Sequence, residues 1–117
     1  MLCTQSDTFD VPVALATILQ IREINSYQRT LFFQNISTST LAIQIEESAD
    51  GGTTWELIDT AFNLGTVGSG SDIAIKNIDS GNILRVRASG GGNDRDVSIS
   101  FARMYLSENN IWTSSVV

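Results

Sequence analysis

The sequence predicts an all-β protein, folded as a single-domain antiparallel β-sandwich of about eight strands. In several short runs, such as 41–46, 84–88 and 97–101, large apolar residues alternate with small or polar ones. This period of two puts one face of a strand on the core and the other in water. Turn residues separate the runs, and no long window has the 3.6-residue period of an amphipathic helix. These observations together exclude a helical domain.

The expected strands follow one another between clusters of Gly, Asn, Asp and Ser. They lie near residues 12–24 (long enough for two segments), 29–36, 41–47, 54–59, 61–67, 72–77, 83–89 and 96–106. The run 73–76 is a shorter version of the same alternation, with Ile73 and Ile75 as its apolar side. This many short strands is typical of a β-sandwich, and the sequence leaves open whether it is a jelly roll or an immunoglobulin-like fold.

The chain of 117 residues corresponds to one domain, with ends that differ from its body. Residues 11–106 are expected to form the β-sandwich. Residues 1–10 are mostly polar and are expected to be an N-terminal arm, and residues 107–117 a C-terminal tail. The candidate interface residues on these ends are Phe9, Ile111, Trp112, Val116 and Val117.

Trp112 is the leading candidate anchor, because Trp buries a large area with few rotatable bonds. In this interpretation the tail buries Trp112 in a neighbouring subunit. The alternative is that the tail forms a last strand or folds back on its own domain.

Composition and charge argue against several functions. The net charge is −6, which disfavours binding to nucleic acid, because phosphate attraction needs an excess of Lys and Arg. The chain has no His and a single Cys, so a disulfide framework, a Cys/His zinc site and a His-based catalytic triad are excluded. Residues 11–21, the longest apolar-rich run, are shorter than the ~20 residues that a membrane helix needs. No basic start or apolar stretch marks residues 1–10 as a secretory signal.

The carboxylates do not form a recognisable catalytic or metal-binding arrangement. Glu46 and Glu47 are adjacent, so on a strand they point to opposite faces and cannot act on one bond. Asp94 and Asp96 could share a face, but they follow a glycine-rich loop. The spaced acids of a helix–loop–helix calcium site are absent. We therefore expect no enzyme activity, no catalytic residues, no metal and no cofactor.

Residues 48–55 match a known local sequence motif at every specified position. Ser48-Ala49-Asp50-Gly51-Gly52-Thr53-Thr54-Trp55 matches the Asp-box pattern Ser-x-Asp-x-Gly-x-Thr-Trp. Such boxes recur in sialidase propellers as structural hairpins, and one box cannot build a propeller, which needs four or more blades. The motif therefore predicts a structural hairpin at 46–57. Its residues are Ser48, Asp50, Gly52, Thr54 and Trp55, in which the Asp accepts backbone N–H groups across the turn.

The order of segments resembles that of small β-sandwich virion structural proteins of tailed bacteriophages, over roughly residues 25–106. The segments that carry the resemblance are 29–35 (Arg-Thr-Leu-Phe-Phe-Gln-Asn), 41–46, 48–55, 83–90 and 97–101. The resemblance implies a nonenzymatic capsid cement or decoration protein that bridges and stabilises capsomers. It implies the major capsid protein or other virion proteins as partners, a homo-oligomer (dimer or trimer), a place on the capsid surface of the virion and assembly in the host bacterial cytoplasm. It implies no binding of nucleic acid or membrane.

Two alternatives remain open from the sequence. One is a component of the phage tail or neck. The other is a carbohydrate-binding or adhesion module, which would need an exposed aromatic platform built from Trp55, Trp112, Tyr27 or Tyr105.

Overall fold

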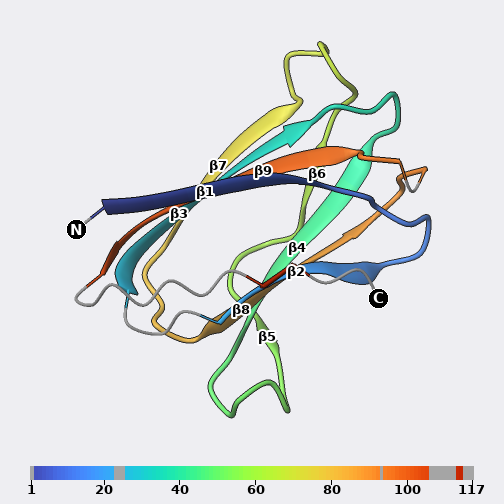
Figure 1. The fold of residues 1–117 in the computed structure, drawn as a ribbon. Helices are drawn as coiled ribbons and strands as arrows, with labels where there is room; N and C mark the ends of the chain where they lie inside the picture. Colours follow the sequence, from blue (N-terminus) through green and yellow to red (C-terminus); the bar gives the residue numbers. More distant parts are fainter. Residues whose placement is uncertain (1, 23–25, 93, 106–112, 115–117) are drawn as a thin grey trace.

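The computed structural model describes residues 2–22, 26–92, 94–105 and 113–114, and it describes side chains within 6–22, 29–92 and 94–102. These residues form ten strands joined by turns and loops (Figure 1). The strands are β1 (Leu2–Phe9), β2 (Ala16–Ile21), β3 (Ser26–Asn35), β4 (Leu41–Ser48), β5 (Glu56–Leu57), β6 (Phe62–Leu64), β7 (Ile73–Ile78), β8 (Ile83–Ser89), β9 (Val97–Tyr105) and β10 (Thr113–Ser114). The prediction of an all-β chain is confirmed.

The strands form two antiparallel sheets packed face to face. One sheet has the order β1-β9-β3-β7, and the other has the order β10-β2-β8-β4-β5, with β6 also paired to β4. The pairs are nested along the chain: β4 with β6, β3 with β7, β2 with β8 and β1 with β9. This nested pairing is the topology of a jelly roll, so the structure decides between the two sandwich types that the sequence left open.

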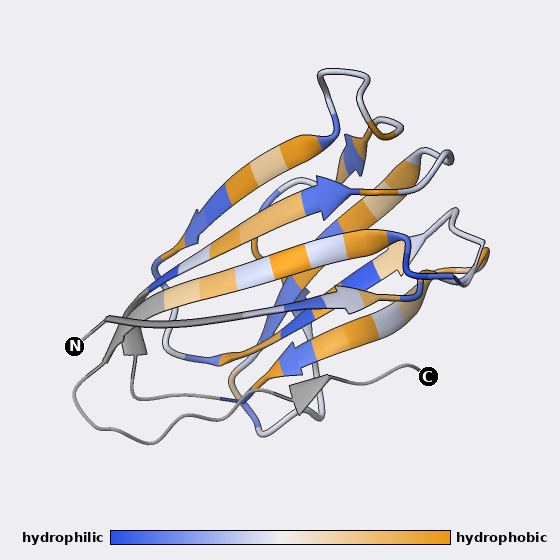
Figure 2. Ribbon diagram, turned by 45° about the horizontal axis from the view of Figure 1, so that its top comes forward, coloured by the Kyte–Doolittle hydropathy of each residue, from blue (hydrophilic) through white to orange (hydrophobic). Residues whose placement is uncertain are grey.

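The core lies between the two sheets and is almost entirely aliphatic and aromatic. In β4 and β8 the buried side chains alternate with partly exposed ones, and the register places Ile43 beside Ala88 and Ile45 beside Val86. From the other sheet, Phe33 and Phe101 are fully buried against this layer. Figure 2 shows the resulting alternation of hydrophobic and hydrophilic residues along the strands. This alternation made these strands recognisable in the sequence.

The N-terminal segment is part of the sandwich. Residues 2–9, expected as part of an arm, form β1 and pair with β9 from Leu2–Met104 to Phe9–Val97. Phe9, which the sequence predicts to be an interface residue, is only 3% exposed and belongs to the core of its own chain. The segment has too few apolar side chains to show the two-residue period, so the backbone ladder and one buried ring hold it in place.

Four loops meet at one end of the jelly roll, where they form a hydrogen-bonded group. They are the β1–β2, β3–β4, β6–β7 and β8–β9 connections. Backbone hydrogen bonds join three pairs of these loops. The N–H of Ile36 donates to the carbonyl of Asp96 (2.9 Å), that of Val67 to the carbonyl of Ser37 (2.9 Å) and that of Gly90 to the carbonyl of Val13 (3.1 Å). These bonds satisfy backbone groups that strand pairing does not reach, so the end is held as one ordered surface.

Asp96 and Gly91 lock the β8–β9 loop onto the β1–β2 loop. The buried Asp96 carboxylate accepts the backbone N–H groups of Val11 (3.0 Å) and Gly92 (3.1 Å). Gly91 is packed so closely that an added Cβ would lie 2.3 Å from the Val11 carbonyl oxygen and 2.6 Å from Asp96 Oδ2. Only a residue without a side chain fits here without displacing the backbone.

We expect Gly91→Ala to lower the free energy of unfolding by about 2 kcal/mol, because the new methyl group must push backbone atoms apart. Urea unfolding followed by tryptophan fluorescence measures the change. Gly92→Ala is the matched control, because an added Cβ at Gly92 meets nothing within 4 Å. Equal stability of the two variants would contradict the close approach at Gly91.

Candidate protein interface

Two acidic residues of β4, Glu46 and Glu47, have structural partners. Glu46 lies on the outer face of the second sheet, where its Oε1 is 2.6 Å from Arg85 Nε. Glu47 accepts hydrogen bonds from the Ser80 hydroxyl (2.7 Å) and the Asn82 amide (2.8 Å), and these bonds lower the pKa of Glu47. Among the residues that the structure describes, no three His, Cys, Asp or Glu side chains are grouped to hold a metal ion.

Asp50 organises the hairpin between β4 and β5. Its Oδ1 accepts the Ser48 hydroxyl (2.7 Å) and the backbone N–H groups of Thr53 (3.0 Å) and Thr54 (2.9 Å). Its Oδ2 accepts the Thr54 hydroxyl at 2.5 Å. These bonds, those of Thr54 first, hold the pKa of Asp50 well below its ordinary value. Both carboxylate oxygens are used within the turn, so the geometry is that of a structural Asp box.

Replacing Asp50 with alanine is expected to open this turn. The Thr53 and Thr54 amides lose their acceptor, and their hydrogen exchange should become faster by an order of magnitude or more. Because the pKa of Asp50 is lowered in the folded state, its stabilising effect is present above the ordinary Asp pKa of about 3.9 and is lost as the pH falls further, through the folded pKa. Amide exchange measured by NMR checks the first result. Asp79→Ala, at another exposed turn position, is the control and should leave both amides protected.

Trp55 packs within its own hairpin and against β8. Its Nε1 donates to the Gly52 carbonyl oxygen (3.1 Å), and the Arg85 guanidinium lies 4.3 Å from the ring centroid, as in a cation–π contact. Arg85 therefore covers one face of the ring that the sugar-binding hypothesis would need. The side chains of Tyr27, Tyr105 and Trp112 lie outside the described residues.

An exposed apolar row runs along one border of the four-stranded sheet. Phe32 on β3 is 41% exposed, and its cross-strand neighbour Ile75 on β7 is 55% exposed. Ile73, also on β7, is 61% exposed, and Ile36 continues the same outward side just beyond β3. We call Phe32, Ile36, Ile73 and Ile75 the edge patch. Apolar groups gathered in this way mark protein contact sites more often than isolated exposed residues do.

The edge patch corrects the sequence interpretation of the run 73–76. The alternation there assigned Ile73 and Ile75 to the core, but both point outward, and Ala74, Lys76 and Ile78 face the other sheet. Period alone gives two faces without saying which is buried, and here the apolar face is the solvent face. Lys76 favoured the wrong assignment, because a charged residue is expected on the solvent face; the signal against it was Ile78, a large apolar residue that shares its face with Ala74 and Lys76.

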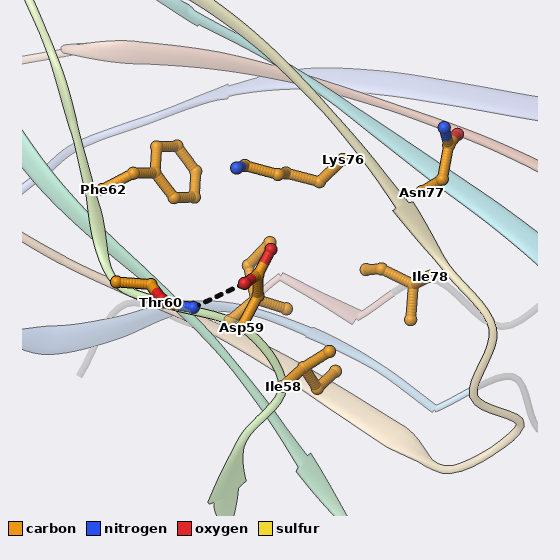
Figure 3. A pocket seen from close by; sticks show the side chains of 8 residues that line it. Ile58, Asp59, Thr60, Phe62, Lys76, Asn77 and Ile78 are labelled. Carbon is orange, nitrogen blue, oxygen red and sulfur yellow. Dashed lines mark hydrogen bonds between the residues drawn. The ribbon is translucent and has the colours of Figure 1, made fainter.

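A small cavity opens beside this edge, between β7 and the segment that joins β5 to β6 (Figure 3). Its volume is about 220 Å³, and Ile45, Ile58, Phe62 and Ile78 supply its apolar lining. The Lys76 ammonium lies 4.4 Å from the Phe62 ring centroid, and the Asp59 carboxylate accepts the N–H of Thr60 (2.7 Å). The cavity is smaller than the ~300–1,000 Å³ of typical small-molecule sites.

The predicted interface residues of the tail cannot be placed beside this patch. Ile111, Trp112, Val116 and Val117 lie outside the described residues, and Thr113 and Ser114 form β10 against Gln20 and Leu19 of β2. The tail contact therefore stays a prediction. No helix long and apolar enough to cross a membrane occurs in the described parts of the chain.

The fold defines the class of protein: a single jelly-roll domain. No protein-family model matches the chain, and no curated protein matches it. Solved structures do share the fold. The chain is similar to one from Bacillus endospore appendages, described as a family of disulfide-linked pili, with a TM-score of 0.65, 15% identity, and coverage of 92% of this chain and 88% of the other.

Two further structures have the same architecture. A chain of PirA aligns with a TM-score of 0.52 at 12% identity, over 86% of this chain and 91% of the other. A chain of desmodium yellow mottle tymovirus aligns with a TM-score of 0.51 at 5% identity, over 93% of this chain and 91% of the other. At these identities the likeness concerns the fold.

Proposed function

We propose that this chain is a nonenzymatic structural subunit of a virion, and that it acts as a capsid cement or decoration protein. The observation that carries the proposal is the edge patch, an exposed apolar surface on an ordered jelly roll. Asp50 and Glu46 have structural partners, in the hairpin and on the outer face of the second sheet. The solved neighbours support it, because they include a chain from pili and a chain from a virus.

In this role the chain binds the major capsid protein or other virion proteins on the capsid surface, as a homo-oligomer, after assembly in the host bacterial cytoplasm. A protein that binds only the assembled shell stabilises it by mass action. The polar remainder of the outer face, with Ser6, Thr8, Ser98 and Ser100, suits many weak hydrogen bonds around an apolar centre. The predicted tail anchor Trp112 would add a second contact.

The proposal is tested by measuring how many copies of this chain each virus particle contains. Particles purified from the source culture are quantified by mass spectrometry for this chain against the major capsid protein. Hundreds of copies per particle are expected for a cement protein. A few to a few dozen copies would instead place it in the tail or neck. Absence from particles would refute the virion role, and recovery in purified filaments would point to an appendage subunit.

A further inference from the structure

We propose that β7 is the contact of a two-fold symmetric dimer, in which β7 of one copy pairs antiparallel with β7 of a second copy. The inference rests on the proposed structural role and names the surface through which two subunits join. Strand β7 ends the order β1-β9-β3-β7, so within the described chain no strand covers its outer edge. A long edge with apolar side chains is a template for pairing with another strand.

The backbone of β7 shows which residues would bond to the added strand. The N–H of Asn35 donates to the carbonyl of Asp72 (2.8 Å), so Asp72 directs its backbone toward β3. Backbone groups alternate between the two edges of a strand, so Ala74 and Lys76 also bond toward β3. Ile73 and Ile75 therefore present their N–H and C=O groups at the free edge, where a second strand can accept and donate.

One register satisfies the side chains as well as the backbone. When Ile73 lies opposite Ile75 of the second copy, the two-fold axis passes between the two Ala74 residues, and four Ile side chains form one cluster flanked by Phe32 of each copy. In the same register Lys76 lies opposite Asp72 of the second copy, which is 8% exposed and whose Oδ2 accepts the N–H of Gly68 in its own chain (3.2 Å). A shift that places Ile75 opposite itself puts Lys76 against Ala74 and leaves the ammonium without an anion.

Charge favours a second copy of this chain as the occupant. Lys76 makes no ion pair with any residue that the structure describes, and its contact there is the Phe62 ring. Each β7 edge thus carries one cation and, four residues earlier, one anion, in the order that an antiparallel two-fold contact brings together. Two copies that each carry a net charge of −6 repel one another overall, and the local pairing of Lys76 with Asp72 acts against this repulsion.

The opposing possibility is that Lys76 protects the edge. Charged residues that point inward on an edge strand are one way in which proteins prevent pairing. The two hypotheses predict opposite effects of one substitution on the strength of association. Lys76→Ala weakens association if Lys76 pairs with Asp72 of the second copy, and it strengthens association if Lys76 is a guard, which would overturn the proposal.

The register is tested by cross-linking in the full chain with Cys3 replaced by Ser. Ala74→Cys places two thiols across the axis in a non-hydrogen-bonded pair, with Cβ atoms about 4.5–5.5 Å apart, close enough for a disulfide after slight adjustment. A covalent dimer is expected under mild oxidation. Asn77→Cys is the control, on the same strand but opposite residue 71, and should stay monomeric on denaturing gels. Equal cross-linking of both variants, or of neither, would overturn the register.

The dimer itself is tested by sedimentation equilibrium. The wild-type chain should be dimeric, and Ile75→Lys should weaken the dimer on the order of 100-fold, because the change occurs twice and buries two like charges near each other. Val13→Lys is the control: Val13 is 75% exposed, lies in the β1–β2 loop and should leave the dimer intact. A monomeric wild-type chain at about 100 µM would refute the inference. The copy number per particle would still test the proposed function separately.

Discussion

Replacing Phe33 with alanine is expected to lower the free energy of unfolding by about 4 kcal/mol. Phe33 is fully buried on β3, in register with Ile99 of β9 and Ala74 of β7. Its ring meets that of Phe62 edge to face, with centroids 5.5 Å apart, and so joins the two sheets beside the cavity. Truncation leaves a space that the stiff strands on both sides cannot close.

The adjacent residue provides the control. Phe32 is next in the chain but points to the opposite face, so Phe32→Ala should cost about 1 kcal/mol or less. Both variants are measured by urea unfolding at several protein concentrations, which separates folding from association. Similar losses from the two variants would mean that β3 does not turn these rings to opposite faces.

Asn35→Ala is expected to cost about 3 kcal/mol, because buried and partly buried backbone groups of two loops lose their hydrogen bonds to this amide. The Asn35 amide nitrogen donates to the carbonyls of Ser39 (2.6 Å), Gly65 (2.9 Å) and Leu64 (3.3 Å). Its Oδ1 accepts the N–H and the hydroxyl of Ser37, each at 2.8 Å. One fully buried side chain therefore joins the β3–β4 loop to the end of β6.

Thermal unfolding measures this loss, with Asn63→Ala as the control. Asn63 is the same residue type, exposed on the short strand β6. The control variant should unfold within about 0.5 kcal/mol of the wild type. An Asn35 variant as stable as the Asn63 variant would show that water replaces the amide at no cost.

Asn35 also illustrates what the sequence could not provide. Its position at a strand end marked it as a turn residue, and nothing in the neighbouring sequence points to partners some 30 residues later. The alternation in 41–46 and 84–88 predicted strands and their buried faces, because each contains several large apolar residues. In 73–76 the same rule selected the wrong face. The choice there depends on which strand ends the sheet, and that is a property of the whole topology.

In the candidate site, too, features built from one short segment could be predicted from the sequence, and features built from distant segments could not. The hydrogen bonds of the Asp box could be predicted because they lie within eight consecutive residues, whereas the contact of Trp55 with Arg85 could not. The edge patch combines Phe32 and Ile36 with Ile73 and Ile75, two segments that become neighbours only through the β3–β7 pairing. A single sequence contains no local signal for such a combination.

The pairing of β1 with β9 has a consequence for the timing of synthesis. Strand β9 is the last long strand to leave the ribosome, yet it lies between β1 and β3 in the middle of its sheet. Until β9 is made, β1 has no neighbouring strand in its sheet, and the core lacks the buried β9 side chains Val97, Ile99 and Phe101. Contacts this distant in sequence make folding slow, and they form late. The four-stranded sheet therefore cannot be completed before β9 has been translated.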